Sequence, residues 1–492
     1  MSGGAIDRRE LLRRAGAGAA AAAGGIGLLG SRRVAGSAAA RPDGPNLLVV
    51  MIDSLRADHV GAYGFKPVHT PNLDALARES LRFERGFPEA MPTVPARRSL
   101  LLGRRIYPWR GWRPVKGLPA TPGWAGVGAH DTTWLSALRA HGWWTGYVTD
   151  NPFVGFTGPF DGFRRSVDRF LPISGRVGAR KPASSVSERD LLHWLPERMR
   201  TRRYLTGLRQ YLANTGAGRD ERQSGAARVF TQAVDVLREA GGERPFALVV
   251  DCFDPHEPWD PPRKYLNRYG DPRYRGVEPG DVRYTHASYL TAAERRRLPA
   301  VYAATVTMTD AWLGRLLDAF HASGRAQDTV LVLLSDHGIL LGERGWTGKP
   351  AVELHPELIH VPFLLRDPQG RGAGAATPYF ASPHDVGPTL LSIAGVPAPR
   401  AMNGSDLSPL LRGAQPRRAR PFWYGGYANH FYVRDDDWAM IAGGNDRGRM
   451  LFDLRADPGE RRDVAARHRD VLDTLYRAVL RDAGGTSLPF YR

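Results

Sequence analysis

Cysteine is almost absent from this 492-residue sequence, which contains only Cys252. A single cysteine excludes an intramolecular disulfide framework and any metal cluster built from cysteines. Cys252 lies in an apolar stretch at residues 246–253, so we interpret it as a core residue and not as a nucleophile. Long apolar runs are also missing after the N-terminal region, where none reaches the roughly 18 residues that a membrane helix requires.

Acidic residues are fewer than basic ones, so the formal net charge is +18, and arginine carries most of the positive charge. This balance suits an anionic substrate or surface, although a genome-wide compositional bias produces the same excess. No stretch resembles a nucleic-acid-binding module, so we predict no nucleic-acid partner. Arginine is dense in residues 164–223, which we interpret as an insertion or lid that forms either a solvated helical surface or a polyanion site.

The N-terminal segment resembles a twin-arginine export signal. Arg8 and Arg9 precede a pair of leucines and a stretch of alanine and glycine at residues 15–30, and small residues at 37–40 offer a cleavage site. The stretch is less hydrophobic than a membrane anchor. We therefore predict that residues 1–40 are a signal, that the mature protein is periplasmic or extracellular, and that it has no stable membrane insertion after cleavage.

Three short apolar runs, at residues 46–52, 245–253 and 329–335, are typical of buried parallel strands. Stretches with helical spacing lie between them, and we expect helices at residues 70–80, 132–141 and 298–323. Strands that alternate with helices predict an α/β fold, in which a large, mixed, mostly parallel sheet is sandwiched by helices.

The C-terminal part has a different pattern. Short alternating strands are expected near residues 422–424, 431–433 and 438–441, followed by an amphipathic helix at 463–481. We therefore divide the chain into the signal at 1–40, a catalytic α/β domain at 45–415, and a small C-terminal α+β subdomain at 416–492.

Polar residues follow two of the predicted buried strands. Asp53 comes directly after the first, and Asp336 and His337 come after the third. The carboxyl ends of strands are where an open α/β sheet places its chemistry. Two carboxylates and one imidazole form a metal site with positions left open. The alternatives are a helix-capping role for Asp53 and a loop histidine with satisfied hydrogen bonds for His337.

The PTVPAR motif at residues 92–97 places Thr93 at the start of a predicted helix, where backbone N–H groups favour an anion. Arg97 lies four residues later, so its guanidinium can hold the nucleophile or a bound anion. The alternative for Thr93 is a plain N-cap. His256, in a PHEP motif after the second strand, is a candidate site residue because of its place at a strand end.

These motifs resemble the sulfatase family. The stretch at residues 92–103 resembles its nucleophile turn, which reads Cys-x-Pro-Ser-Arg before a Leu-Leu-Thr-Gly helix. The strings at residues 53–74, 255–258, 335–349 and 382–397 continue the resemblance, which spans about residues 45–485. It implies the sulfatase branch of the alkaline-phosphatase superfamily and an anionic ester substrate.

The resemblance also implies roles for individual residues. Asp53, Asp336 and His337 correspond to ligands of one divalent cation; oxygen ligands favour calcium, and manganese, magnesium or zinc remain possible. Lys349 corresponds to a lysine that contacts the sulfate and the nucleophile. His256 corresponds to a histidine that binds the anionic group or assists proton transfer to the leaving oxygen.

The sequence departs from the family in three places. Thr93 replaces the cysteine that is normally oxidised to formylglycine, so we expect no formylglycine. Ser54 replaces a second metal-binding aspartate. The usual Gly-Lys-x-His segment is missing from residues 142–153, and His355 and His360 are candidates to compensate.

We therefore predict a metal-dependent sulfatase-like hydrolase that cleaves a sulfate, phosphate or phosphonate ester with Thr93 as the nucleophile. A free threonine hydroxyl is a weak nucleophile at neutral pH, so its pKa must be lowered by a metal. The alternative is a non-catalytic protein that binds a metal and an anion on a sulfatase scaffold. No oligomeric state follows from the sequence.

Overall fold

The computed structural model describes residues 44–64, 67–176 and 178–491. In this part of the chain, eight strands form one mixed sheet in the order β12-β2-β11-β8-β1-β6-β4-β5. The three predicted strands are confirmed as its centre: β1 spans Asn46–Ile52, β6 spans Phe246–Cys252 and β8 spans Thr329–Ser335. β1 is parallel to both of its neighbours.

The remaining strands flank this centre. β4 (Trp144–Thr149) and β5 (Arg169–Pro172) extend the parallel side. On the other side, β11 (Phe363–Arg366) is antiparallel to β8 and β2 (Leu81–Gly86), and β12 (Ala376–Ala381) pairs with β2 in parallel. The fold class is therefore the predicted mostly parallel, mixed α/β sheet.

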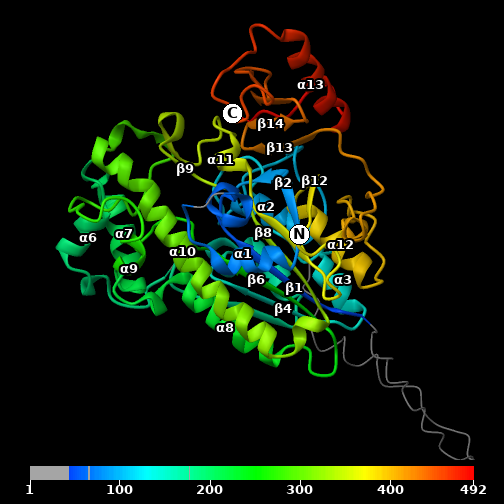
Figure 1. Cartoon of the computed structure of the whole chain (residues 1–492), viewed down its shortest axis with the longest axis horizontal. Coiled ribbons are helices and arrows are strands. Elements are labelled where there is room, and N and C mark those ends of the chain that lie inside the picture. Colours follow the sequence, from blue (N-terminus) through cyan, green and yellow to red (C-terminus); the bar gives the residue numbers. More distant parts are fainter. Residues whose placement is uncertain (1–43, 65–66, 177, 492) are drawn as a thin grey trace, which may run out of the picture. The chain divides into compact units, whose positions relative to one another are not determined.

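Helices cover both faces of the sheet because the side chains of its central strands alternate between two cores. Leu48, Val50 and Ile52 of β1 pack with α1 (Pro71–Arg78), α8 (Gly225–Glu239) and α10 (Ala292–Ala322). The residues between them pack with α2 (Thr93–Leu102), α3 (Trp134–Ala140) and α12 (Val386–Ile393). Figure 1 shows the long α10 running beside α8. Both cores are continuous with the strands that end at the candidate site.

Two helices start six residues from their predicted positions. α10 begins at Ala292, before the predicted residue 298, because Thr291 and Glu294 form a capping box that starts it earlier. The C-terminal helix α13 spans Arg469–Asp482 and not 463–481. Asp463 lies outside it because its carboxylate accepts from the backbone N–H groups of Leu451 and Ala465.

The arginine-rich stretch is only partly the predicted insertion. Its residues 169–172 form β5, which pairs with β4 at the edge of the main sheet. The rest contains the predicted helical pieces, α6 (Glu188–Trp194) and α7 (Arg202–Thr215). β5 is an edge strand in which apolar and polar residues do not alternate clearly, so the sequence pattern does not predict it.

The C-terminal strands form a second sheet. In the described residues it has five strands in the order β16-β15-β14-β13-β3, with β13 at Trp423–Tyr427, β14 at His430–Arg434, β15 at Trp438–Gly443 and β16 at Met450–Asp453. β3 (Ala90–Met91) directly precedes the turn that contains Thr93, so this sheet is tied to the candidate site. α13 packs on it through Leu472, Leu475 and Val479.

No helix among the described residues combines the length and apolar character needed to cross a membrane. The predicted signal at residues 1–40 lies outside the described residues. Cys252 is fully buried in β6, as predicted for a core residue.

Candidate active site

Asp53, Asp336 and His337 lie together because their strands are neighbours. Ile52 and Ser335 are opposite each other at the ends of β1 and β8, so the residues that follow leave the sheet at the same edge. Possible ligand atoms of the three residues all lie within 4.8 Å of one another. All three side chains are fully buried. The structure thus brings together the predicted metal ligands.

Neighbouring polar groups hold these three side chains in place. The backbone N–H of Ser54 donates to Asp336 Oδ1 at 2.9 Å, and its hydroxyl donates to Asp53 Oδ1 at 2.7 Å. His337 donates from Nδ1 to the carbonyl of Gly338 at 2.8 Å, which leaves the lone pair on Nε2. Ser54 therefore orients a ligand at the position where the family usually has another carboxylate.

The electrostatics of the group reflect burial and like charge. Burial, together with the nearby charge of Asp336, raises the pKa of Asp53. Burial acts in the same direction on Asp336, but His337 and Arg97 outweigh it and lower the pKa of that carboxyl. Burial lowers the pKa of His337 to about 4, so its imidazole is neutral at neutral pH. A neutral imidazole beside carboxylates is a donor set for a divalent cation.

Thr93 is the first residue of α2, and its hydroxyl oxygen lies 3.3 Å from His337 Nε2. The alternative interpretation of Thr93 as an N-cap is wrong, because the N-cap is Pro92 and no side chain caps the helix. Thr93 also lines a cavity of about 600 Å³. Its hydroxyl therefore lies between the acidic group and the cavity.

Of the two roles that the sequence left open for Arg97, the contacts fit the one in which it holds residue 93. Its guanidinium is fully buried and forms a bidentate pair with Asp251, at 2.6 Å and 3.0 Å. It also lies 3.0 Å from Asp53 Oδ2 and donates to Asp336, and it donates to the Thr93 carbonyl at 3.2 Å. Arg97 thus contacts the Thr93 backbone and the acidic group, and it does not line the cavity in the described part of the chain.

Sequence reasoning missed Asp251 and its partners. Asp251 lies in β6, and it accepts from the hydroxyls of Tyr147 at 2.9 Å and Thr149 at 3.1 Å. Burial and the charge of Asp251 raise the pKa of Tyr147, so its hydroxyl stays a donor. The available signal was a carboxylate inside an apolar strand, which requires a buried cationic partner.

The opposite side of the cavity holds His256 and Lys349. Lys349 Nζ lies 3.2 Å from His256 Nε2, and it is paired with the Glu257 carboxylate at 3.0 Å. His256 Nδ1 lies 2.6 Å from the Glu257 carbonyl, so it donates and Nε2 accepts from the ammonium group. Burial lowers the pKa of His256 to about 3. The predicted residues Thr93, His256 and Lys349 thus line one cavity.

The missing Gly-Lys-x-His segment is not replaced by the two histidines suggested above. His355 Nδ1 pairs with Glu460 at 2.8 Å, and His360 Nε2 bonds to the Glu84 carbonyl at 2.9 Å. Neither belongs to the cavity lining in the described part of the chain. At the segment's own position, Asp150 accepts from the backbone N–H of Phe253 at 2.7 Å. The basic side chains of the usual segment therefore have no counterpart there.

A helix-start hydroxyl beside a buried acid–imidazole group, at the carboxyl edge of a mostly parallel sheet, is the arrangement of an ester hydrolase. The family model described as Sulfatase matches residues 45–396. A second model, described as N-sulphoglucosamine sulphohydrolase, C-terminal, matches residues 342–481. The chain belongs to the sulfatase family and is a sulfuric or phosphoric ester hydrolase.

Individual relatives cover nearly the whole chain. The multifunctional alkaline phosphatase superfamily protein PehA of Trinickia caryophylli is 26% identical over 89% of this chain and 93% of its own length. An arylsulfatase of Clostridium perfringens is 23% identical over 90% of this chain and 95% of its own. The solved phosphonate monoester hydrolase of Agrobacterium radiobacter has the same fold, with a TM-score of 0.69 and 21% identity over 90% of this chain and 96% of that one. These comparisons do not favour the non-catalytic alternative.

Proposed function

We propose that this protein is a metal-dependent hydrolase that cleaves an anionic sulfate, phosphate or phosphonate ester with Thr93 as its nucleophile. The observation that carries the proposal is the position of the Thr93 hydroxyl, which lines the cavity and lies 3.3 Å from His337 Nε2. A hydroxyl at a helix start is close to backbone N–H groups that stabilise negative charge on it and on a bound ester.

One divalent cation suits the residues present. Asp53 Oδ2 is a buried atom without a hydrogen-bond partner in the described residues, although it lies 3.0 Å from the Arg97 guanidinium. Asp53, Asp336 and His337 would hold the cation, with calcium the first expectation and manganese, magnesium or zinc as alternatives. When bound, such an ion lowers the pKa of a nearby hydroxyl and neutralises charge on an ester oxygen.

The protein's own groups set the geometry of the attack. Because His337 donates from Nδ1 to Gly338, its Nε2 is the nitrogen that would ligate the cation, and it lies 3.3 Å from the Thr93 hydroxyl. The hydroxyl is therefore next to the group that would hold the cation. Arg97 fixes the Thr93 carbonyl and is itself fixed by Asp251. We infer that Arg97 and Asp251 position the nucleophile and offset the charge of the acidic group, without touching the substrate.

His256 and Lys349 are placed to serve the leaving group. In the neutral tautomer described above, the transferable proton of this pair is on the Lys349 ammonium, which donates to His256 Nε2. The Thr93 hydroxyl gives up its proton to solvent as its oxygen bonds to sulfur or phosphorus, and the ester bond to the leaving oxygen breaks while a proton from this pair neutralises that oxygen. Water then attacks the ester on Thr93. Its hydroxide part bonds to sulfur or phosphorus, the Thr93 oxygen leaves and takes up a proton, and the pair regains its proton from solvent.

Thr93 favours phosphorus esters over sulfate esters. A formylglycine hydrate expels sulfate by breaking its own hemiacetal, whereas an ester on threonine must be attacked by water. Relatives of this chain include both an arylsulfatase and a phosphatase-superfamily protein, so both ester classes belong in the test.

The cavity wall also favours an aromatic or apolar leaving group. Aromatic side chains dominate the part of the wall beyond the charged residues, and such rings stack on aryl groups. These side chains are Trp124, Phe153, Tyr204, Phe253, Tyr284 and Tyr427.

A substrate panel tests the proposal. Purified protein is assayed with 4-nitrophenyl sulfate, phosphate monoester, phosphate diester and phenylphosphonate ester, each with calcium, magnesium, manganese or zinc and with a chelator. We expect metal-dependent turnover that is higher for a phosphorus ester and is lost in Thr93→Ala. Absence of turnover with every ester and metal, in protein that still binds a cation, would support the non-catalytic alternative.

A further inference from the structure

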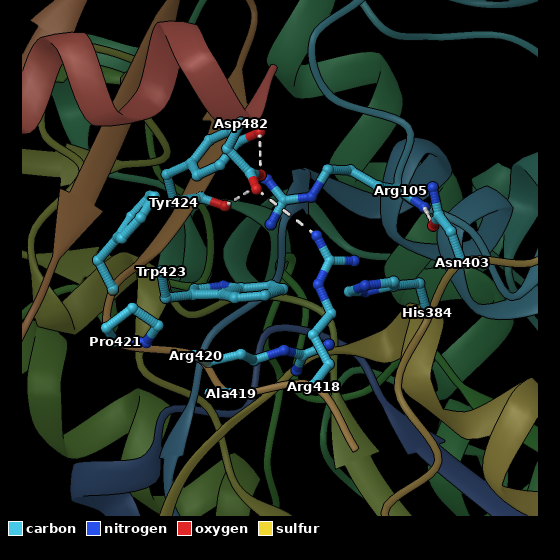
Figure 2. A pocket seen from close by; sticks show the side chains of 11 residues that line it. Arg105, His384, Asn403, Arg418, Ala419, Arg420, Pro421, Trp423, Tyr424 and Asp482 are labelled. Carbon is cyan, nitrogen blue, oxygen red and sulfur yellow. Dashed lines mark hydrogen bonds and ion pairs between the residues drawn. The ribbon is translucent and has the colours of Figure 1, made fainter. Parts of the chain in front are cut away.

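A second cavity, of about 130 Å³, lies away from the candidate active site. It is formed where residues after α2 meet β13 of the C-terminal sheet. No residue lines both cavities. Figure 2 shows that the side chains of Arg105, Arg418 and His384 are turned towards the same space. Its chemistry is therefore independent of the proposed hydrolysis.

Arg420 lines this cavity, but its guanidinium is already paired with a carboxylate. Its guanidinium donates to both oxygens of Asp385, at 2.7 Å and 2.6 Å, and only 4% of its side chain is exposed. The pair is bidentate, so the charge of Arg420 is largely offset. A ligand in the cavity would therefore meet the other two arginines as its main donors.

The guanidinium of Arg105 faces the cavity, and its neighbours hold it in that position. Its backbone N–H donates to Asn403 at 2.8 Å, and its guanidinium lies over the ring of Tyr424 at 3.9 Å and over Trp423 at 4.6 Å. One N–H donates to the Tyr424 carbonyl at 3.2 Å. In the described part of the chain, its other guanidinium N–H groups have no hydrogen-bond acceptor. Stacked guanidinium groups with free N–H donors are preorganised for an anion.

The side chain of Arg418 lies on the opposite side of the cavity from Arg105 and forms only a weak ion pair. Its nearest carboxylate is Asp482, at 3.5 Å, and Asp482 also accepts from the Tyr424 hydroxyl at 2.9 Å. The side chain of Arg418 is 57% exposed. Three guanidinium groups thus stand against the carboxylates of Asp385 and Asp482, so the cavity keeps a positive excess.

His384 provides an independent sign of a missing ligand. Its ring is 2% exposed and stacks on Trp423, with 5.6 Å between ring centroids. Nε2 lies 3.5 Å from Asp385, but Nδ1 is buried and has no hydrogen-bond partner among the described residues. Leaving a buried polar atom unpaired costs free energy, so Nδ1 requires a partner, which a ligand in the cavity would supply.

We propose that this cavity binds a tetrahedral oxyanion, namely a sulfate or phosphate group, between Arg105, Arg418 and His384. With a proton on each ring nitrogen, a form that the negative charge of a bound anion favours, His384 donates from Nδ1 to the anion while Nε2 faces Asp385 at 3.5 Å. A volume of 130 Å³ corresponds to about four waters at ~30 Å³ each, which is room for one such group. The group is either a free ion or a substituent of a larger molecule that reaches the opening beside Arg418.

Equilibrium dialysis with radiolabelled sulfate tests the proposal at constant ionic strength, with chloride as the balancing ion. Unlabelled inorganic phosphate and dextran sulfate are the competing probes. Competition by phosphate identifies free ions as ligands, and competition by dextran sulfate alone identifies a group carried on a polymer. Both outcomes support oxyanion recognition by the protein, and the variants below assign it to this cavity.

Three variants decide whether the binding belongs to this cavity. Arg418→Gln and Arg105→Gln should each weaken one class of sulfate sites at least tenfold, while Arg417→Gln, an exposed neighbour outside the lining, should leave it unchanged. Because Arg418 is exposed, its variant remains informative if Arg105→Gln does not fold. Unchanged binding in Arg418→Gln, or an equal loss in Arg417→Gln, overturns the proposal. Ester turnover is not measured, so failure of the proposed hydrolysis leaves this test intact.

Discussion

Arg97 and Asp251 form a bidentate ion pair with no solvent exposure, at 2.6 Å and 3.0 Å, beside the turn that contains Thr93. The pair joins α2 to β6, and Arg97 extends from it to the carboxylates of Asp53 and Asp336. The start of α2 is therefore attached to the sheet through charges as well as through apolar packing.

Removing one partner of this pair should be costly. We expect Asp251→Leu to lower the free energy of unfolding by about 3–5 kcal/mol, because it leaves the Arg97 charge less compensated and deprives Tyr147 of its acceptor. Denaturant unfolding measures the change. Asp235→Asn, on the exposed side of α8, is the control and should change stability by less than about 0.5 kcal/mol. A loss below about 1 kcal/mol in Asp251→Leu would contradict this account.

Thr93→Ala should abolish turnover and leave the fold intact. Nucleophile loss in hydrolases costs on the order of 10⁴ to 10⁶ in rate. No stability loss from capping is expected, because Thr93 does not cap α2. Thr93→Ser keeps the hydroxyl and should retain activity. Substantial turnover in Thr93→Ala would mean that water attacks the ester directly.

Thr93→Cys is a separate test of the same position. In a host that generates formylglycine, the restored cysteine should raise sulfate ester hydrolysis specifically, because the hydrate can expel sulfate. The ratio of sulfate to phosphate turnover is the measurement, and Thr93→Ser made in the same host is the control. An unchanged ratio in protein that carries formylglycine would show that other residues set the ester preference.

Asp336→Ala should remove the bound divalent cation. Asp336 supplies one of two carboxylates within reach of His337, so its loss leaves too few anionic ligands. Elemental analysis of purified protein, checked for folding by circular dichroism, gives the metal content. Asp318→Ala, an exposed change on α10, is the control. Equal metal content in the two variants would place the cation elsewhere.

Substrate binding should weaken as the pH rises through about 7. Burial, and then the charge of Glu257, raise the pKa of Asp281 in the cavity wall to about 7. Above that pH its new negative charge repels an anionic ester, so KM should rise about tenfold, which is ~1.4 kcal/mol. Asp281→Asn should flatten the profile of KM against pH, whereas Asp271→Asn, on the surface, should not.

The raised pKa of Asp281 also predicts how the free energy of unfolding changes with pH. Its folded pKa is raised above the unfolded value of about 3.9, so its contribution is fully present below pH 3.9 and is lost as the pH rises through about 7. Asp281→Asn should therefore gain stability relative to the parent protein between pH 4 and pH 8. No pH-dependent difference in unfolding free energy would contradict the raised pKa.

Export should depend on Arg8 and Arg9, which lie outside the described residues. Replacing both with lysine should retain the protein in the cytoplasm, because the twin-arginine signature requires the pair. Replacing Arg13 and Arg14 in the same way is the control. Cell fractionation measures the outcome, and continued export of the first variant would remove the argument for this route.

The sequence by itself determined the local structure and the chemistry that each strand end carries. Apolar runs specified β1, β6 and β8, and the residues after β1 and β8 gave Asp53, Asp336 and His337. Local patterns suffice for these strands because strand formation depends on neighbouring residues, whereas the starts of α10 and α13 lie six residues from their predicted positions.

Only the tertiary structure decided which distant side chains face one another. The order β8-β1-β6-β4 places Asp251 beside Tyr147 and Thr149, and the docking of α2 turns Arg97 to these carboxylates and away from the cavity. The second cavity, which is lined by Arg105, Arg418 and Arg420, likewise brings together residues more than 300 positions apart in the sequence. Such contacts depend on long-range packing of strands and helices, which the period of a sequence pattern does not encode.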